Sequence, residues 1–280
     1  MVTPTTRSST ECSIDAALGD RTPVGVPPAI NIRNLSKSYQ SRSGVVDALR
    51  DITLSVHDGE FVSLIGPSGC GKTTILNILS GLLPYDGGEV IVGGEPARAG
   101  RHDVGLMPQN ATLLPWLSVL KNVLLPLTIF HKKDESAVRR AHALLEITGL
   151  TEFEDKYPWE LSGGMQQRAN LVRALVFEPR FLLMDEPFAA LDEFTREKLT
   201  IELAGLHERE NRTTVYVTHN IAEAVFLSDH VVVMRPRPAE VVEIVETHLP
   251  RPRSRYLIDD PQTARLVTHI RETLFRYEIQ

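Results

Sequence analysis

Nine residues in the first third of the chain have the composition of a phosphate-binding loop. The run Gly-Pro-Ser-Gly-Cys-Gly-Lys-Thr-Thr (66–74) follows an apolar stretch at 61–65 that predicts a buried strand. Apolar residues at helical spacing come next: Ile75, Leu76, Ile78, Leu79, Leu82 and Leu83. Strand, glycine-rich turn, Lys-Thr and helix are the context in which such a loop binds phosphate. A surface turn before a helix is the alternative, and the complete context disfavours it.

Each part of this loop has a task in anion binding. Its glycines let successive backbone N–H groups surround a phosphate, and the helix N-terminus adds a positive dipole. We expect Lys72 to reach the β- and γ-phosphates and the Thr73 hydroxyl to bind Mg²⁺. The predicted nucleotide contacts are Gly66, Pro67, Ser68, Gly69, Cys70, Gly71, Lys72, Thr73 and Thr74.

Two carboxylates end a second apolar run. Residues 181–184 are continuously apolar, which predicts a strand buried on both faces of a parallel sheet, and Asp185 and Glu186 follow. The end of such a strand opens toward the ligand crevice. We expect Asp185 to hold Mg²⁺ and Glu186 to polarise the water that attacks the γ-phosphorus. The alternative is that Asp185 and Glu186 only begin a helix, since paired acids are frequent at helix N-termini. Asp192 is a candidate cap of the helix that begins at Glu193.

Two further residues follow predicted strands. Gln109 comes after the strand at 103–108, where its amide is able to touch Mg²⁺ or a water; a solvated loop glutamine is the alternative. His219 follows the strand at 213–218 and is placed to donate a hydrogen bond to the γ-phosphate. An isolated histidine is more often structural, so that alternative stays open.

A second anion site is predicted at residues 161–168, Leu-Ser-Gly-Gly-Met-Gln-Gln-Arg. Ser162 has the type of a helix N-cap, and Gly163 and Gly164 leave backbone N–H groups bare at that helix N-terminus. A plain capped helix is the alternative. One nucleotide rarely needs two such sites in one chain.

The remaining pattern predicts an α/β chain with additions. Alternating segments at 30–35, 48–56 and 89–92 predict an antiparallel sheet, in which Tyr39 is either a core or edge aromatic or a stacking platform for adenine. Residues 110–160 predict a mostly helical insertion. Its apolar segment 113–127, broken by Pro115 and Pro126, is helix core or a docking surface. Residues 231–234 form the last clear strand, 250–255 a basic linker, and 266–275 a short helix.

Composition narrows the class of protein. The chain has 280 residues, 42% hydrophobic and 24% charged, which suits one large or two small globular domains. The net charge of −6 disfavours a dedicated nucleic-acid binder. Two cysteines, Cys12 and Cys70, form no disulfide framework and indicate a reducing, cytosolic setting. No apolar run is long enough for a bilayer span. Residues 1–28 predict a disordered tail without a secretory signal.

The motifs occur in the order found in the ATP-binding subunits of ABC transporters, and residues 30–250 resemble that family. Tyr39 matches the aromatic A-loop, 66–74 the Walker A loop, Gln109 the Q-loop and 161–165 the signature. Residues 181–185 match Walker B, followed by the catalytic Glu186, the D-loop Asp192 and the H-loop His219. Residues 114–119, 186–188 and 249–253 resemble the nitrate/sulfonate/taurine-type importer ATPases. The departures are Asn220 in place of Asp, Ala189 in place of Gly or Ser, and a missing Pro-Gly turn at 235–240.

The resemblance implies a P-loop NTPase (RecA-like) α/β core with an antiparallel β subdomain and an inserted α-helical subdomain. It implies an ATPase domain at 29–250, a helical insertion at about 110–160 and a C-terminal extension at 251–280. Two copies would pack head to tail with ATP and Mg²⁺ between one P-loop and the partner's Ser162–Gly164. A permease would dock near 113–127, with a solute-binding protein as indirect partner, at the cytoplasmic face of the plasma membrane.

Other functions within and beyond transport remain as alternatives. An exporter or a lipid-trafficking system would use the same ATPase motifs. A soluble ABC ATPase acting on nucleic acid or ribosomes is disfavoured by the single P-loop and the acidic balance, so we expect no nucleic-acid partner. A regulator that barely turns over is disfavoured by the presence of both Glu186 and His219.

Overall fold

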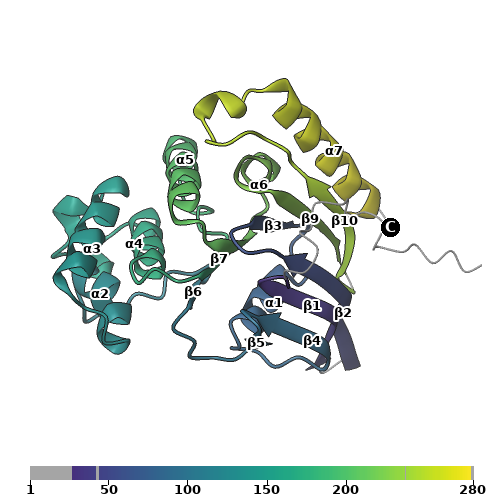
Figure 1. The fold of residues 1–280 in the computed structure, drawn as a ribbon, viewed down its shortest axis with the longest axis horizontal. Helices are drawn as coiled ribbons and strands as arrows, with labels where there is room; N and C mark the ends of the chain where they lie inside the picture. Colours follow the sequence, from purple (N-terminus) through teal and green to yellow (C-terminus); the bar gives the residue numbers. More distant parts are fainter. Residues whose placement is uncertain (1–26, 42–43, 237, 279–280) are drawn as a thin grey trace, which may run out of the picture.

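Two sheets form the centre of the molecule (Figure 1). The computed structural model describes residues 27–41, 44–236 and 238–278. The first 26 residues of the predicted tail, including Cys12, lie outside this range. The smaller sheet has the strand order β2-β1-β4-β5 and is antiparallel, as the alternating segments predict. Its strands are β1 (Ile30–Ser41), β2 (Gly44–Val56), β4 (Gly87–Val92) and β5 (Glu95–Pro96).

The larger sheet has the order β10-β9-β3-β8-β7-β6. Its inner pairs are parallel, and β10 closes one edge antiparallel to β9. Every residue of β3, β7 and β8 is buried, as expected for strands covered on both faces. The strands are β3 (Phe61–Ile65), β6 (Val104–Met107), β7 (Phe181–Asp185), β8 (Thr213–Val217), β9 (His230–Arg235) and β10 (Glu240–Glu246).

Side chains along β7 alternate between two hydrophobic clusters. Phe181 and Leu183 belong to the cluster that contains α1 (Lys72–Leu79) and the antiparallel sheet. Leu182 and Met184 belong to the cluster that contains the helices α2–α5. Because successive strand residues point to opposite faces, Asp185, the last residue of β7, is directed to the α1 side like Phe181 and Leu183.

The helices α2, α3 and α4 lie together to one side of the sheets (Figure 1). Their buried residues share one core cluster with α5, and the short helix η3 (Pro158–Glu160) precedes α4. Asp192 caps α5 as expected, since its carboxylate accepts a hydrogen bond from Thr195 N. The helices in the rest of the chain are α2 (Val119–Ile129), α3 (Glu135–Ile147), η2 (Thr151–Phe153), α4 (Gly163–Leu175), α5 (Glu193–Glu210), α6 (Ile221–Leu227), η4 (Arg255–Leu257) and α7 (Pro261–Glu278).

Two predictions for helices were wrong. The helix after the phosphate loop ends at Leu79, so Leu82 lies beyond it and is 63% exposed. Pro126 lies inside α2 and does not break the apolar segment. Burial of Val123 and Leu127 on both sides of Pro126 keeps this helix in place despite the lost backbone donor.

The end of the chain differs most from the prediction. Residues 250–255 do not form a loose basic linker: the Arg253 guanidinium is buried and donates to the Ser228 carbonyl at 2.8 Å, and Arg251 pairs with Asp229 at 2.8 Å. These partners are remote in sequence, so the local pattern of arginines and prolines did not indicate them. The terminal helix is 18 residues long rather than 10, and β9 and β10 form their hairpin without a Pro-Gly turn.

Helix α7 packs onto the parallel sheet. Ile270 is fully buried in a cluster with Ile65, Val225, Val233 and Leu249. Ile65 is the last residue of β3, directly before the glycine-rich loop. The terminal helix therefore supports the strand that carries this loop.

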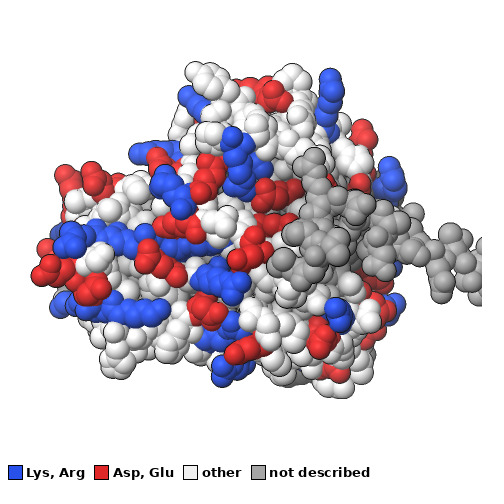
Figure 2. Space-filling view, in the orientation of Figure 1, with Lys and Arg blue, Asp and Glu red and all other residues white. Residues whose placement is uncertain are grey.

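Among the residues that the structure describes, none of the helices combines the length and the apolarity of a bilayer span. Figure 2 shows Lys and Arg interspersed with Asp and Glu over the part of the surface where α2–α4 lie.

The packing of α7 predicts a large stability change for Ile270→Ala. Truncating a fully buried isoleucine costs about 2–5 kcal/mol of unfolding free energy, because buried area is lost and a cavity remains. Denaturant unfolding measures it, with the exposed Arg276→Ala on the same helix as control. A change of only a few tenths of a kcal/mol would mean that α7 is not part of the folded unit.

Candidate functional site

The carboxyl ends of four parallel strands bring the predicted site residues to one edge of the sheet. The glycine-rich loop follows β3, Gln109 follows β6, Glu186 follows β7 and His219 follows β8. Parallel strands end at the same edge, which is where open α/β sheets bind ligands.

The loop at 66–74 curves tightly around its lysine. Gly69 and Gly71 have φ angles of 78° and 82°, which residues other than glycine rarely adopt. A Cβ at Gly66 would lie 2.6 Å from the Met234 carbonyl oxygen, so this position also requires glycine. The Lys72 ammonium donates to the carbonyls of Gly66 at 2.7 Å and Pro67 at 3.0 Å. Its charge therefore lies inside the loop that is predicted to bind phosphate.

A hydroxyl and a carboxylate lie side by side at the start of α1. Asp185 is 3% exposed, and burial raises the pKa of its carboxyl, while the neighbouring Thr73 side chain lowers it. This contact follows from the alternation along β7, which directs Asp185 toward α1. Mg²⁺ prefers oxygen ligands and uses one or two carboxylates together with phosphate oxygens. The pair Thr73 and Asp185 therefore fits the predicted magnesium site.

Gln109 and His219 both contact Glu186, the residue directly after β7. One Glu186 carboxylate oxygen accepts a hydrogen bond from Gln109 Nε2 at 3.0 Å, and the other lies 3.4 Å from His219 Nδ1. Glu186 also has a φ angle of 47°, an uncommon conformation for a residue with a Cβ. Of the four residues that the sequence predicts for catalysis, Gln109 and His219 thus each contact Glu186, and the fourth, Lys72, lies in the glycine-rich loop.

Helix α4 fixes the loop that carries Gln109. The Gln167 side-chain amide donates to the Gln109 carbonyl, and Arg173 donates to the Thr112 carbonyl at 2.7 Å. Gln167 is buried and Gln109 is exposed, so this bond anchors an exposed loop to the helix. The helix that begins with Gly163 therefore also determines where Gln109 lies.

The second predicted anion site lies apart from the first. Ser162 caps α4 by accepting a hydrogen bond from Met165 N at 3.3 Å, and Gly163 is open on its Cβ side. In Figure 1 the helix α4 packs with α2 and α3, separated from α1 by β6 and β7. A Cβ at Gly164 would lie 3.0 Å from Leu191 Cδ2, so this helix end adjoins the loop after β7. The structure does not bring Ser162–Gly164 to the glycine-rich loop of the same chain.

Tyr39 lies on β1 of the antiparallel sheet and is 40% exposed. Its ring is 5.7 Å from the Lys37 ammonium. Because the ring is exposed, it is available to stack on an adenine base, as one of the two interpretations of Tyr39 requires.

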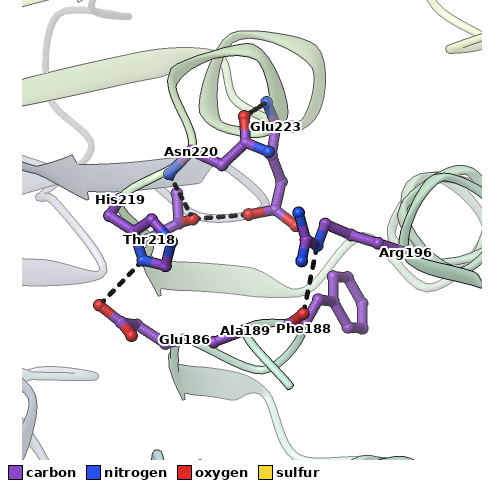
Figure 3. Close-up of a pocket in the computed structure, with 8 residues that line it drawn as sticks. All are labelled: Glu186, Phe188, Ala189, Arg196, Thr218, His219, Asn220 and Glu223. Carbon is purple, nitrogen blue, oxygen red and sulfur yellow. Dashed lines mark hydrogen bonds and ion pairs between the residues drawn. The ribbon is translucent and has the colours of Figure 1, made fainter. Parts of the chain in front are cut away.

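The sequence reasoning missed two groups of residues beside the site. In the terminal helix, Arg271, Leu274 and Phe275 line a recess together with Gly66, Pro67, Ser68, His219 and Ile221. Figure 3 shows a small pocket behind Glu186 and His219 that also contains Arg196 and Glu223. No sequence motif indicates Arg271, Leu274, Phe275, Arg196 or Glu223 as site residues. Only the fold brings them beside the site.

The departure at Asn220 has a structural explanation. Its side-chain oxygen accepts a hydrogen bond from Glu223 N at 3.1 Å and so caps α6. Asparagine serves this purpose as well as aspartate does. Ala189 is exposed and lines the same pocket.

A glycine-rich loop between a parallel strand and a helix, with Lys72, Thr73 and a strand of the same sheet ending in Asp185, defines a P-loop NTPase. Comparison with known proteins narrows this class. A family model described as ABC transporter matches residues 49–189. This chain belongs to the ABC transporter family, as its motifs predict.

Curated relatives and solved structures agree with this assignment. An uncharacterised ABC transporter ATP-binding protein of Methanocaldococcus jannaschii is 43% identical over 82% of this chain and 86% of its own length. An aliphatic sulfonates import ATP-binding protein, SsuB of Bacillus cereus, is 40% identical over 81% of this chain and 89% of its own. The ATP-binding cassette MJ0796, solved as a post-hydrolysis dimer with ADP and phosphate, has a TM-score of 0.72 at 32% identity and covers 79% of this chain and 100% of its own. The predicted α/β fold is confirmed, and the chain is an ATP-hydrolysing, nucleotide-binding subunit.

The position of Arg271 predicts an electrostatic effect on nucleotide binding. Arg271→Glu replaces a cation with an anion in the recess beside Ser68, so ATP affinity should fall about threefold to tenfold at low salt, and less at high salt. Fluorescent-nucleotide titration measures it. Arg265→Glu, exposed on the same helix but outside the recess, is the matched control. Equal losses in both variants would exclude a local effect.

Proposed function

We propose that this chain works as a head-to-tail dimer in which each ATP lies between one P-loop and the partner's Ser162–Gly164. The observation that carries the proposal is the separation of two anion-binding helix ends within one chain. The glycine-rich loop lies directly before α1, whereas Ser162–Gly164 lie at the start of α4, which packs with α2 and α3 across β6 and β7 from α1 (Figure 1). A single phosphate chain therefore does not reach both. A second copy supplies the missing half of each site.

Within this site the residues of the chain divide the work. Lys72 and the loop amides hold the phosphates, and Tyr39 stacks on the adenine. Thr73, Asp185 and Gln109 hold Mg²⁺, which neutralises charge on the β- and γ-phosphates when it is bound. Glu186 orients and polarises the attacking water, and His219 donates a hydrogen bond to the γ-phosphate. The contacts of Glu186 with both Gln109 and His219 support this assignment, since all three then face one reacting centre.

The proposed permease dock centres on the segment before α2. Many apolar side chains of residues 113–127 pack in the core, among them those of Val119, Val123 and Leu127. Trp116, in contrast, is 69% exposed beside Pro115. An exposed tryptophan is a frequent anchor of protein interfaces. Its connection to Gln109 through the loop 109–116 gives the permease a path to the nucleotide.

The transport direction we propose is import, and the cargo a small anion of the sulfonate, nitrate or taurine kind. The similarity to an aliphatic sulfonates import ATP-binding protein supports this, together with the family-like strings at 114–119 and 249–253. The subunit would sit at the cytoplasmic face of the plasma membrane, held there by the permease, and a solute-binding protein would deliver the cargo.

The role of Glu186 predicts the behaviour of Glu186→Gln. Loss of the general base should lower kcat about 10²- to 10⁴-fold while ATP still binds and the dimer still forms. Phosphate-release assays and nucleotide titration separate the two effects. Glu152→Gln, on the exposed helix η2, should hydrolyse ATP normally. Normal turnover by Glu186→Gln would refute the proposed base.

The composite site predicts that Ser162→Arg binds ATP as a monomer but does not dimerise. The arginine fills the space where the partner's phosphate would lie, while the P-loop remains intact. Size-exclusion chromatography of the ATP-bound protein, in the Glu186→Gln background, reports on closure. Ser162→Ala removes only the helix cap, and Thr151→Arg adds the same bulk elsewhere on the helical part. If Ser162→Arg still dimerised with ATP, the P-loop and the partner's helix end would not share a nucleotide.

A further inference from the structure

A buried carboxylate supports the loop that carries His219. Glu223, on α6, is 7% exposed, and its Oε2 accepts a hydrogen bond from the Thr218 hydroxyl at 2.6 Å. The Thr218 hydroxyl in turn accepts from Asn220 N at 3.0 Å. His219 lies between these two residues, so Glu223 holds the backbone on both sides of it (Figure 3).

A cation supports the loop after β7 in the same way. Arg196, on α5, donates to the carbonyls of Phe188 at 3.3 Å and Leu191 at 2.7 Å. The Leu191 side chain is buried and adjoins Gly164 at the start of α4. Arg196 therefore holds the loop 187–192, which follows Glu186 in sequence and adjoins Gly164 in the second predicted anion site.

These two groups face each other across a pocket. Among the described residues, Glu223 Oε1 and the hydroxyl of the neighbouring Tyr216 are both buried without a hydrogen-bond partner. The pocket that it shares with Arg196 has room for about one water molecule. Burial raises the pKa of the Glu223 carboxyl, while the Thr218 and Tyr216 hydroxyls and, to a smaller extent, the positive charge of Arg196 lower it. A buried carboxylate oxygen without a partner costs free energy, and a bridging water removes that cost.

We propose that Arg196 and Glu223 form a water-bridged pair that positions His219 and ties its loop to the loop 187–192. Glu223 supports His219, which faces the nucleotide bound by the chain's own P-loop. Arg196 supports the loop that adjoins Gly164, which faces the nucleotide bound by the partner's P-loop. The pair therefore links the two nucleotide-binding regions of one chain. This link rests on the proposed head-to-tail dimer. The positioning of His219 does not, because the hydrogen bonds lie within one chain.

The first test is the split between kcat and KM. Arg196→Ala and Glu223→Ala should each lower kcat about tenfold and change KM for ATP less than twofold, because the P-loop is untouched. Glu223→Gln keeps an acceptor for the Thr218 hydroxyl and should lose less than Glu223→Ala. Lys198→Ala, exposed and two residues from Arg196 on α5, should match the wild type. Thermal unfolding curves of all variants are measured first, and the assays are run at a temperature at which every variant is folded, so that a lower kcat does not reflect unfolding.

A double-mutant cycle separates a pair from two independent supports. If the two residues act through one bridge, Arg196→Ala combined with Glu223→Gln lowers kcat no further than the more damaging single variant does. If the losses multiply, or if folded single variants keep a normal kcat, the proposal is wrong. Normal turnover by Glu186→Gln would overturn the proposed function instead, whatever this cycle shows.

Discussion

The parallel pairing of β3, β8, β7 and β6 is the constraint on which the site depends. Each strand ends at the same edge, so a loop, a glutamine, two acids and a histidine from distant parts of the chain meet there. Complete burial of β3, β7 and β8 protects this arrangement, because a slip of one residue would exchange the two faces of a strand. Asp185 would then no longer meet Thr73.

Two chemical tasks meet at the end of β7. Asp185 lies with Thr73 beside the phosphate loop, and Glu186, directly after the strand, contacts Gln109 and His219. Two adjacent carboxylates of like charge are thus kept in different surroundings. The φ of 47° at Glu186 is part of this arrangement, and such strain is tolerated where the surrounding structure holds it. Here Glu186 N donates to the Val217 carbonyl at 2.9 Å, which holds the strained residue against β8.

The sequence indicated what depends on local pattern. The glycine-rich loop, the apolar strands and the caps at Ser162 and Asp192 were predictable because their causes lie within a few residues. Arg196 and Glu223 were not, since charged residues on a helix usually face solvent and only tertiary packing turns these two inward. The same holds for Arg253, whose partners Ser228 and Glu208 are remote in sequence. Pro126 shows the reverse case, in which core packing overrides a strong local signal.

Several contacts of α4 reach the loops at the sheet edge that carry or follow site residues. Gln167 and Arg173 of α4 hold the loop after β6, which carries Gln109. Leu191 adjoins Gly164, and Arg196 holds the Leu191 carbonyl. A displacement of α4 therefore acts on the loop of Gln109 and on the loop after Glu186 at the same time. Because Glu186 contacts both Gln109 and His219, the position of α4 and the geometry around the reacting centre are not independent.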